Sequence, residues 1–194
     1  VGSAGLAAGF GGLLPPGPIL KSHDPRASED GNHLLVCGTN SEVTRRQIKT
    51  LVAVYPYEEI ALDPGILTDE KGIDAILDDA SLVRSKLSVN HVIVSIDYSR
   101  PLVVSGRHLS QKQAAQTLLA GLERFLAQAL RETRPGLLFL TGGDTADAAL
   151  TVSGAKGIRI FGEIVTGVVQ GTLIVGILDG VPVVTKAGAF GGED

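Results

Sequence analysis

The 194-residue sequence has no methionine or tryptophan, a single cysteine, and aromatic residues at only 4% of the chain. The single cysteine, Cys37, cannot form a disulfide within the chain or a CxxC metal pair, so a cytoplasmic protein is the simplest expectation. The four histidines lie at none of the spacings typical of zinc ligands. We therefore assign no residue as a metal ligand.

An excess of charge and long apolar runs are also missing. The formal net charge is −4, and Lys and Arg are scattered among the acidic residues, so no basic face suited to a phosphate backbone is visible. No apolar run reaches the roughly 18 residues that a membrane-spanning helix needs. We expect neither nucleic acid nor a membrane as a partner.

The missing methionine bears on the extent of the chain. The sequence opens with Val1-Gly2-Ser3-Ala4-Gly5-Leu6-Ala7 rather than with a starter methionine. We therefore expect an excised or truncated chain.

Two regions differ in composition. Residues 1–33 are rich in Gly and Pro, which is typical of a tail and linker. In residues 34–194, short apolar runs alternate with amphipathic stretches, which predicts an α/β domain with a mostly parallel sheet flanked by helices. Glycines among β-branched residues near the C-terminal end predict a small β-rich section there. The expected strands are 34–38, 59–62, 91–96, 137–141, 158–160, 173–177 and 181–185, and the expected helices are 41–54, 69–87, 110–132 and one from Asp144.

The most informative segment is the apolar run 137–141 followed by Gly142, Gly143, Asp144 and Thr145. Glycines at the end of a strand allow a sharp turn and close ligand approach, and the start of the next helix favours a phosphate. The alternative is a tight strand-to-helix turn in which Asp144 is only the N-cap. The local sequence leaves both open.

Two further segments follow strands in the same way. Thr39, Asn40 and Ser41 precede a helix, and the hydroxyls of Thr39 and Ser41 are suited either to phosphate oxygens or to capping the helix. A glycine-rich turn around Gly188 follows the run 181–185, with Lys186 placed to balance phosphate charge. The alternative for this turn is a flexible end of the chain.

Four acidic residues are candidates for Mg²⁺ ligands or for a base: Asp63, Asp97, Glu163 and Asp179. Asp63 and Asp97 close expected strands, where an acid is often only a turn residue. Glu163 lies in an apolar context and is better explained by a hydrogen bond to the backbone than by a catalytic or metal-binding role. Asp179 is the fourth candidate. The sequence contains neither a Walker loop nor a GxGxxG fingerprint in a strand-turn-helix setting. No spacing suggests a hydrolase triad.

Taken in order, these segments resemble the nucleotide-binding C-terminal domain of the four-carbon acid sugar kinase family. The resemblance runs from about Leu34 to the end of the chain. One departure is Thr166, where family members usually carry proline before the glycine. The matching motifs are Val36-Cys37-Gly38-Thr39-Asn40-Ser41 with Thr44 and Gln47, Gly142-Gly143-Asp144-Thr145, Gly162-Glu163-Ile164 with Gly167, Asp179-Gly180, and Thr185-Lys186-Ala187-Gly188-Ala189-Phe190-Gly191.

The resemblance implies an ATP-dependent kinase, using Mg²⁺, that phosphorylates a four-carbon sugar acid such as threonate, erythronate or an oxo-tetronate. It implies that residues 1–33 are the tail of an N-terminal substrate domain plus a linker, and that this domain carries the acid sugar site and the probable base. The isolated chain is then expected to be inactive, and its catalytic residues are unknown. The nucleotide contacts implied by the resemblance are Ser41, Gly142, Gly143, Asp144, Thr145 and Gly188.

Two other functions remain open on the sequence. The first is a non-catalytic α/β module that binds a phosphate-bearing ligand or a partner. The second, disfavoured by the missing dinucleotide fingerprint, is a Rossmann-like oxidoreductase. The sequence does not choose the sugar acid, and it does not distinguish a monomer from a homodimer.

Overall fold

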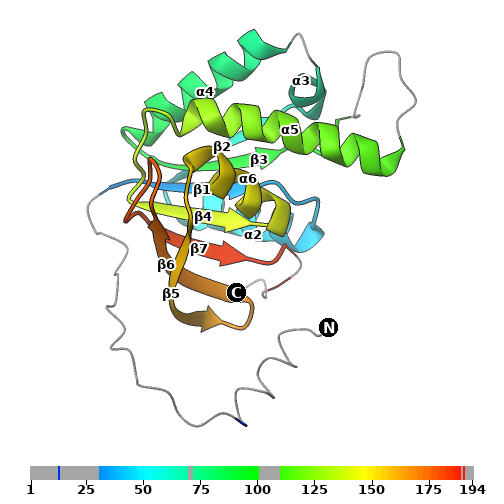
Figure 1. Ribbon diagram of the computed structural model, residues 1–194. Helices are drawn as coiled ribbons and strands as arrows, with labels where there is room; N and C mark the ends of the chain where they lie inside the picture. The colour runs from blue at the N-terminus through cyan, green and yellow to red at the C-terminus, as the bar shows by residue number, and fades with distance from the viewer. Residues whose placement is uncertain (1–12, 14–30, 70–71, 101–109, 189, 191–194) are drawn as a thin grey trace.

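The computed structural model describes residues 13, 31–69, 72–100, 110–188 and 190. Most of the expected tail, residues 1–33, lies outside these described residues. The described part forms an α/β fold with one seven-stranded sheet (Figure 1). The predicted fold class is confirmed.

The sheet has the strand order β2-β3-β1-β4-β7-β6-β5. The five strands from β2 to β7 are parallel to their neighbours, and β6 and β5 continue the sheet as antiparallel strands. The expected β-rich section is thus part of the main sheet, because β7 pairs with β4 in its centre. The strands are β1 (His33–Cys37), β2 (Tyr57–Leu62), β3 (His91–Ile96), β4 (Leu137–Thr141), β5 (Gly157–Val165), β6 (Val168–Ile174) and β7 (Pro182–Lys186).

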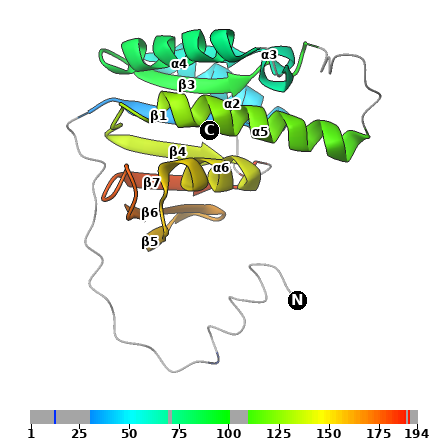
Figure 2. The ribbon, with the colours of Figure 1, turned by 45° about the horizontal axis from the view of Figure 1, so that its top comes forward.

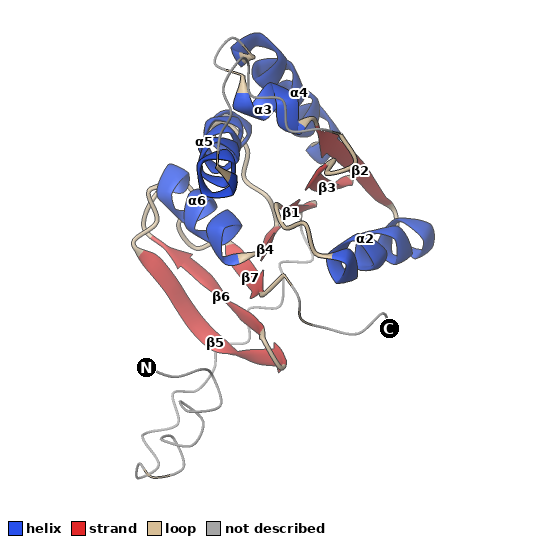
Figure 3. Cartoon of the chain, turned by 90° about the vertical axis from the view of Figure 1, so that its right-hand side faces the viewer, coloured by secondary structure: helices blue, strands red, loops and turns tan. Residues whose placement is uncertain are grey.

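The helices cover the two faces of the sheet unequally. One face carries α3, α4, α5 and α6, whereas α2 lies on the other face (Figures 2 and 3). A short helix, α3, was not expected from the sequence, and α4 begins four residues later than the expected helix 69–87. The helices are α2 (Glu42–Val54), α3 (Pro64–Thr68), α4 (Ile73–Leu87), α5 (Gln111–Ala129) and α6 (Gly143–Ser153).

Local sequence explains why these helices start where they do. The longest, α5, begins with a capping box in which the Ser110 hydroxyl accepts from the Gln113 amide and the Gln113 side chain accepts from the Ser110 amide. In α3, Pro64 occupies the first turn and the Asp63 carboxylate accepts from the Gly65 amide at 2.7 Å. In both helices, a side chain at the N-cap thus accepts from a first-turn amide that has no partner within the helix.

Alternating side chains divide the core into two parts. On the face of α3 to α6, a large cluster includes Val36, Phe125 and Leu140. On the α2 face, a much smaller cluster consists of Leu35, Cys37, Ile48 and Ile93, with Phe139 packed against it. Of the described helices, α2 alone lies on this face, so the described residues leave part of it open (Figure 3).

Of the described helices, none has both the length and the hydropathy needed to cross a bilayer.

Candidate functional site

The candidate site lies at the topological switch point of the sheet, where the helices that follow two neighbouring strands pack on opposite faces. The helix after β1 packs on one face of the sheet, and the helix after β4 packs on the other (Figure 3). Since β1 and β4 are neighbours, their carboxyl ends diverge into a crevice, the usual ligand position in an open α/β sheet. Topology thus places the Gly38 and Gly142 loops on either side of one crevice.

The crevice forms a cavity of about 490 Å³, which we name the switch-point cavity. All six residues that the resemblance suggested line it, together with three that it did not assign. The signal for these three was present in the motif that ends at Ser41. The lining residues are Gly38, Thr39, Asn40, Ser41, Gly142, Gly143, Asp144, Thr145 and Gly188.

Two helix N-termini open into this cavity without side-chain caps. Ser41 is the N-cap residue of α2, yet its hydroxyl makes no capping hydrogen bond. Gly142, with φ of 103°, is the N-cap of α6, so Asp144 lies inside the helix and the alternative that it is the N-cap is wrong. First-turn amides without caps are free to donate to an anion, and the helix dipoles favour negative charge there.

The glycines of the cavity differ in what surrounds them. A Cβ added to Gly143 would meet no atom within 4 Å, so this position faces open space. A Cβ on Gly188 would lie 2.5 Å from Thr39 Oγ1, and one on Gly38 would lie 2.3 Å from Thr145 Oγ1. Gly188 and Gly38 are therefore required by protein packing, whereas at Gly143 the described structure leaves room for a ligand.

Hydrogen bonds from distant segments hold the cavity walls. The Gly142 amide donates to the Lys186 carbonyl at 2.9 Å, which fixes the turn after β4 against β7. The Thr44 hydroxyl donates to the Gly188 carbonyl at 2.8 Å. The Tyr98 hydroxyl donates to the Gly38 carbonyl at 2.6 Å. The three loops are thus preorganised by the fold.

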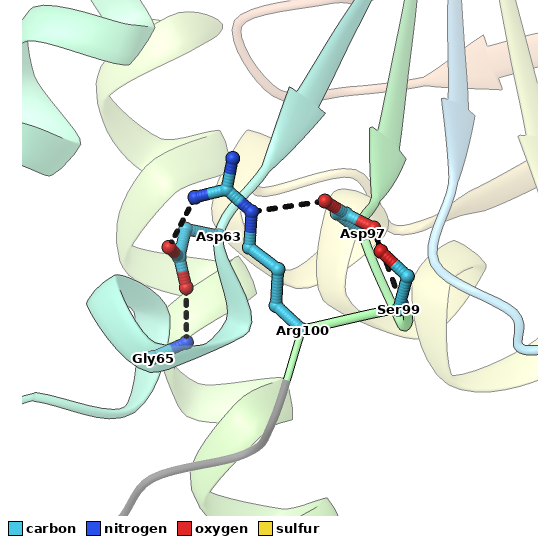
Figure 4. A network of polar contacts seen from close by, with 5 residues as sticks. All are labelled: Asp63, Gly65, Asp97, Ser99 and Arg100. Carbon is cyan, nitrogen blue, oxygen red and sulfur yellow. Dashed lines mark hydrogen bonds and ion pairs between the residues drawn. The ribbon is translucent and has the colours of Figure 1, made fainter.

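Asp63 and Asp97 are engaged in a polar network rather than exposed to this cavity (Figure 4). The Arg100 guanidinium pairs with Asp63 at 2.7 Å and with Asp97 at 3.0 Å. Asp97 also accepts from the backbone amide of Ser99. Hydrogen bonds from Ser99 and Arg100 hold the pKa of Asp97 below its ordinary value. These carboxylates join the ends of β2 and β3.

The carboxylates of Glu163 and Asp179 also accept hydrogen bonds from backbone amides. Glu163 accepts from the Gly167 amide at 2.6 Å and closes the turn between β5 and β6, as the sequence suggested. Asp179 accepts from the Val175 amide at 2.6 Å. Within the described residues, no group of three or more His, Cys, Asp or Glu side chains is arranged to hold a metal ion. None of these four acids lines the switch-point cavity, whose described lining includes the carboxylate of Asp144.

Lys186 does not lie where the sequence suggested. It ends β7, and its side chain is directed to the α2 face, where it lines a different cavity from that of Gly142. Strand alternation explains this placement, because Val184 and Lys186 share the face opposite to Val183 in the larger core. The lysine ammonium is therefore absent from the described lining of the switch-point cavity.

Comparison with known proteins identifies the family. Residues 34–194 match the family model described as the nucleotide-binding C-terminal domain. The chain belongs to this family. The resemblance to the C-terminal domain of the four-carbon acid sugar kinases is confirmed by this match and by two curated kinases.

This chain is similar to part of each of the two curated kinases. The D-threonate kinase of Salmonella typhimurium is 30% identical over 169 residues, which cover 82% of this chain and 40% of that protein. The D-erythronate kinase of Heliobacterium modesticaldum is 24% identical over 199 residues, covering 93% of this chain and 45% of that protein. The chain therefore spans less than half the length of these relatives.

Solved structures share the architecture of the nucleotide-binding C-terminal domain. One is a domain of unknown function from Bordetella bronchiseptica, crystallised with bound citrate as a domain-swapped dimer. It superposes with a TM-score of 0.64 at 27% identity, covering 84% of this chain and 39% of that chain. A Haemophilus influenzae protein superposes with a TM-score of 0.62 at 20% identity, which supports the fold alone.

Proposed function

We propose that this chain is the nucleotide-holding part of an ATP-dependent kinase that phosphorylates a hydroxyl of a four-carbon sugar acid. The observation that carries this proposal is the pair of uncapped helix N-termini beside Gly143, which faces open space in a single cavity. The D-threonate and D-erythronate kinases, which the chain matches over 40% and 45% of their length, support the reaction class.

The residues of the cavity fit a nucleotide phosphate chain. Amides at the start of α6, including that of Gly143, would donate to phosphate oxygens, and the Ser41 hydroxyl is available as a further donor. Thr145 and Gly188 complete the lining. Phosphoryl transfer depends mainly on positioning and charge stabilisation, which these groups would supply.

Mg²⁺ is the expected companion of ATP. This ion usually takes one or two carboxylates together with phosphate oxygens and water. Asp144 is exposed in the first turn of α6 and is the carboxylate of the switch-point cavity suited to this part. The sugar acid and the base that accepts its proton are proposed to lie on a substrate domain outside this chain, so the chain alone should bind nucleotide with negligible turnover.

Calorimetric titration with Mg-ATP tests the proposal on the chain as it stands. Gly143→Ala should weaken binding by roughly tenfold or more, because the new methyl group occupies the space of the ligand while clashing with no described atom. Gly157→Ala is the matched control, since its Cβ also meets nothing within 4 Å but lies at the start of β5. The control should bind ATP like the unmodified chain.

Three results would count against this function. Absence of heat at millimolar Mg-ATP, from a sample whose circular dichroism shows it to be folded, would refute the proposal that the chain binds a nucleotide. Equal affinity of the Gly143→Ala and Gly157→Ala variants for Mg-ATP would show that the Gly142 loop is not part of the nucleotide site. Tighter binding of inorganic pyrophosphate than of ATP would favour a general phosphate-binding module instead.

A further inference from the structure

A second cavity lies on the α2 face of the sheet, and we name it the α2-face cavity. It has a volume of about 810 Å³ and runs between α2, the sheet and the hairpin of β5 and β6. Apolar side chains, among them Leu35, Phe139 and Phe190, form most of its lining. Among the described helices, α2 alone lies on this face of the sheet (Figure 3).

A buried cation lies at one end of the α2-face cavity. Lys186 is only 8% exposed, and its ammonium has two long contacts, 3.3 Å to the Ala187 carbonyl and 3.5 Å to Thr44 Oγ1. In the described part of the chain, no carboxylate approaches its Nζ within 4 Å. Burial lowers the pKa of this ammonium, as expected for a charge without a counter-ion.

An unsatisfied hydroxyl lies on the neighbouring strand, at the position that pairs with Lys186. Thr141 is 1% exposed, and its Oγ1 is the one buried side-chain oxygen or nitrogen in the described residues without a hydrogen-bond partner. Thr141 and Lys186 are register partners on β4 and β7, so they share a face of the sheet. Native proteins seldom leave such groups unpaired, and an unseen ion or ligand is one common explanation.

The neighbouring thiol does not balance the lysine charge. Cys37 is the register partner of Thr141 on β1 and lines the same cavity. Burial raises the pKa of this thiol to about 12, so it is neutral near pH 7. Thr44 lies in the first turn of α2, whose positive end adds to the electropositive field.

The α2-face cavity is separate from the switch-point cavity. The two share none of their lining residues. Between them, the Thr44 hydroxyl donates to the Gly188 carbonyl, and Gly188 packs closely against Thr39. A ligand of the α2-face cavity is therefore not simply an extension of a nucleotide bound at Gly142.

We infer that the α2-face cavity binds a small organic acid, with its anionic group between Thr141 and Lys186 and its apolar body against Phe139 and Phe190. The charge of the Lys186 ammonium favours an anion. A neutral acceptor would pair with the Thr141 hydroxyl but would leave the ammonium without a counter-ion. The aromatic and aliphatic walls decide in favour of an apolar body over a free inorganic ion.

The test uses 4-phenylbutyrate and its neutral counterpart 4-phenyl-1-butanol as probes, with affinities measured by ligand-observed NMR on the whole chain. The carboxylate should bind roughly tenfold tighter than the alcohol, as expected for a charge-assisted contact. Lys186→Met should abolish this preference, and Thr141→Val should reduce it several-fold. Lys186→Met is not expected to prevent folding, because an apolar side chain replaces an unpaired buried charge.

Two controls separate this inference from the proposed nucleotide site. Gly143→Ala should leave both probe affinities unchanged, and saturating Mg-ATP should not displace the carboxylate. Equal affinity for the acid and the alcohol would overturn the inference, as would a preference that survives both Lys186→Met and Thr141→Val. Displacement by ATP, or weakening by Gly143→Ala, would place the probe in the switch-point cavity and overturn it as well.

Discussion

The Thr44 hydroxyl donates a hydrogen bond of 2.8 Å to the carbonyl oxygen of Gly188, 144 positions later in the sequence. This contact joins the first turn of α2 to the loop after β7. It also forms part of the wall between the two cavities, since Thr44 lines one and Gly188 the other. Its removal should therefore affect stability and ligand binding together.

Thr44→Val should lower the free energy of unfolding by about 1 kcal/mol, because an isosteric side chain replaces the donor of one partly buried hydrogen bond. Mg-ATP affinity should fall modestly as the Gly188 loop loses its restraint. Urea denaturation and calorimetry measure the two effects. Thr50→Val makes the same chemical change at an exposed position of α2 and should alter neither. Equal effects of the two substitutions would refute the role given to this contact.

Gly38→Ala should destabilise the fold by about 1–3 kcal/mol, the usual cost of overpacking. The new Cβ would lie 2.3 Å from Thr145 Oγ1 and 3.1 Å from a methyl carbon of Leu122. Thr145→Ala should recover part of this loss in a double-mutant cycle, because it removes the closer atom. Gly162→Ala, where a Cβ meets nothing within 4 Å, is the control. Strict additivity in the cycle would contradict the predicted clash.

Stability should depend on pH through His33 at the start of β1. Its Nδ1 lies 2.8 Å from the Tyr57 hydroxyl, and its ring packs on that of His91 with centroids 4.3 Å apart. Burial, together with the charge of His91, lowers the pKa of His33 from its ordinary value of 6.5. The folded state therefore favours the neutral ring, and the unfolded state takes up the proton first.

It follows that the His33 contribution is fully present above pH 6.5 and is lost as the pH falls through the lower folded-state pKa. His33→Phe keeps a ring at this position and should flatten the fall in stability on the acid side. Denaturation curves at a series of pH values compare the two proteins. The same slope below pH 6.5 in both would show that other groups cause the loss.

Buried strands were the easiest part of the fold to predict. The runs 91–96 and 137–141 were predicted with the bounds of β3 and β4, because mostly apolar runs that are paired on both sides leave little choice of structure. The expected strand 173–177 was wrong, since β6 ends at Ile174. Val175 adopts φ of 66°, which is unusual for a β-branched residue, and its amide is held by Asp179. Such a tertiary constraint leaves no local pattern in the sequence.

Most of the residues of the candidate site were predicted from the sequence, whereas their packing was not. Motifs place Ser41 and the Gly142 loop at the ends of strands, and the topology then brings them into one cavity. The absent Ser41 cap and the open space at Gly143 depend on three-dimensional packing, so no sequence pattern reveals them. For Lys186, the alternation of side chains along β7 would have indicated the α2 face had the strand bounds been known.

The central position of β7 has a consequence for synthesis and folding. β7 follows all the other described strands in the sequence, yet it lies between β4 and β6 and supplies the carbonyl that anchors Gly142. A nascent chain that has emerged only as far as β6 lacks both this anchor and the neighbour that joins the β5 and β6 hairpin to the sheet. Ligand-binding competence should therefore arise late, after a slow, long-range strand insertion. Until then, the edge of β4 is exposed to mispairing with another strand.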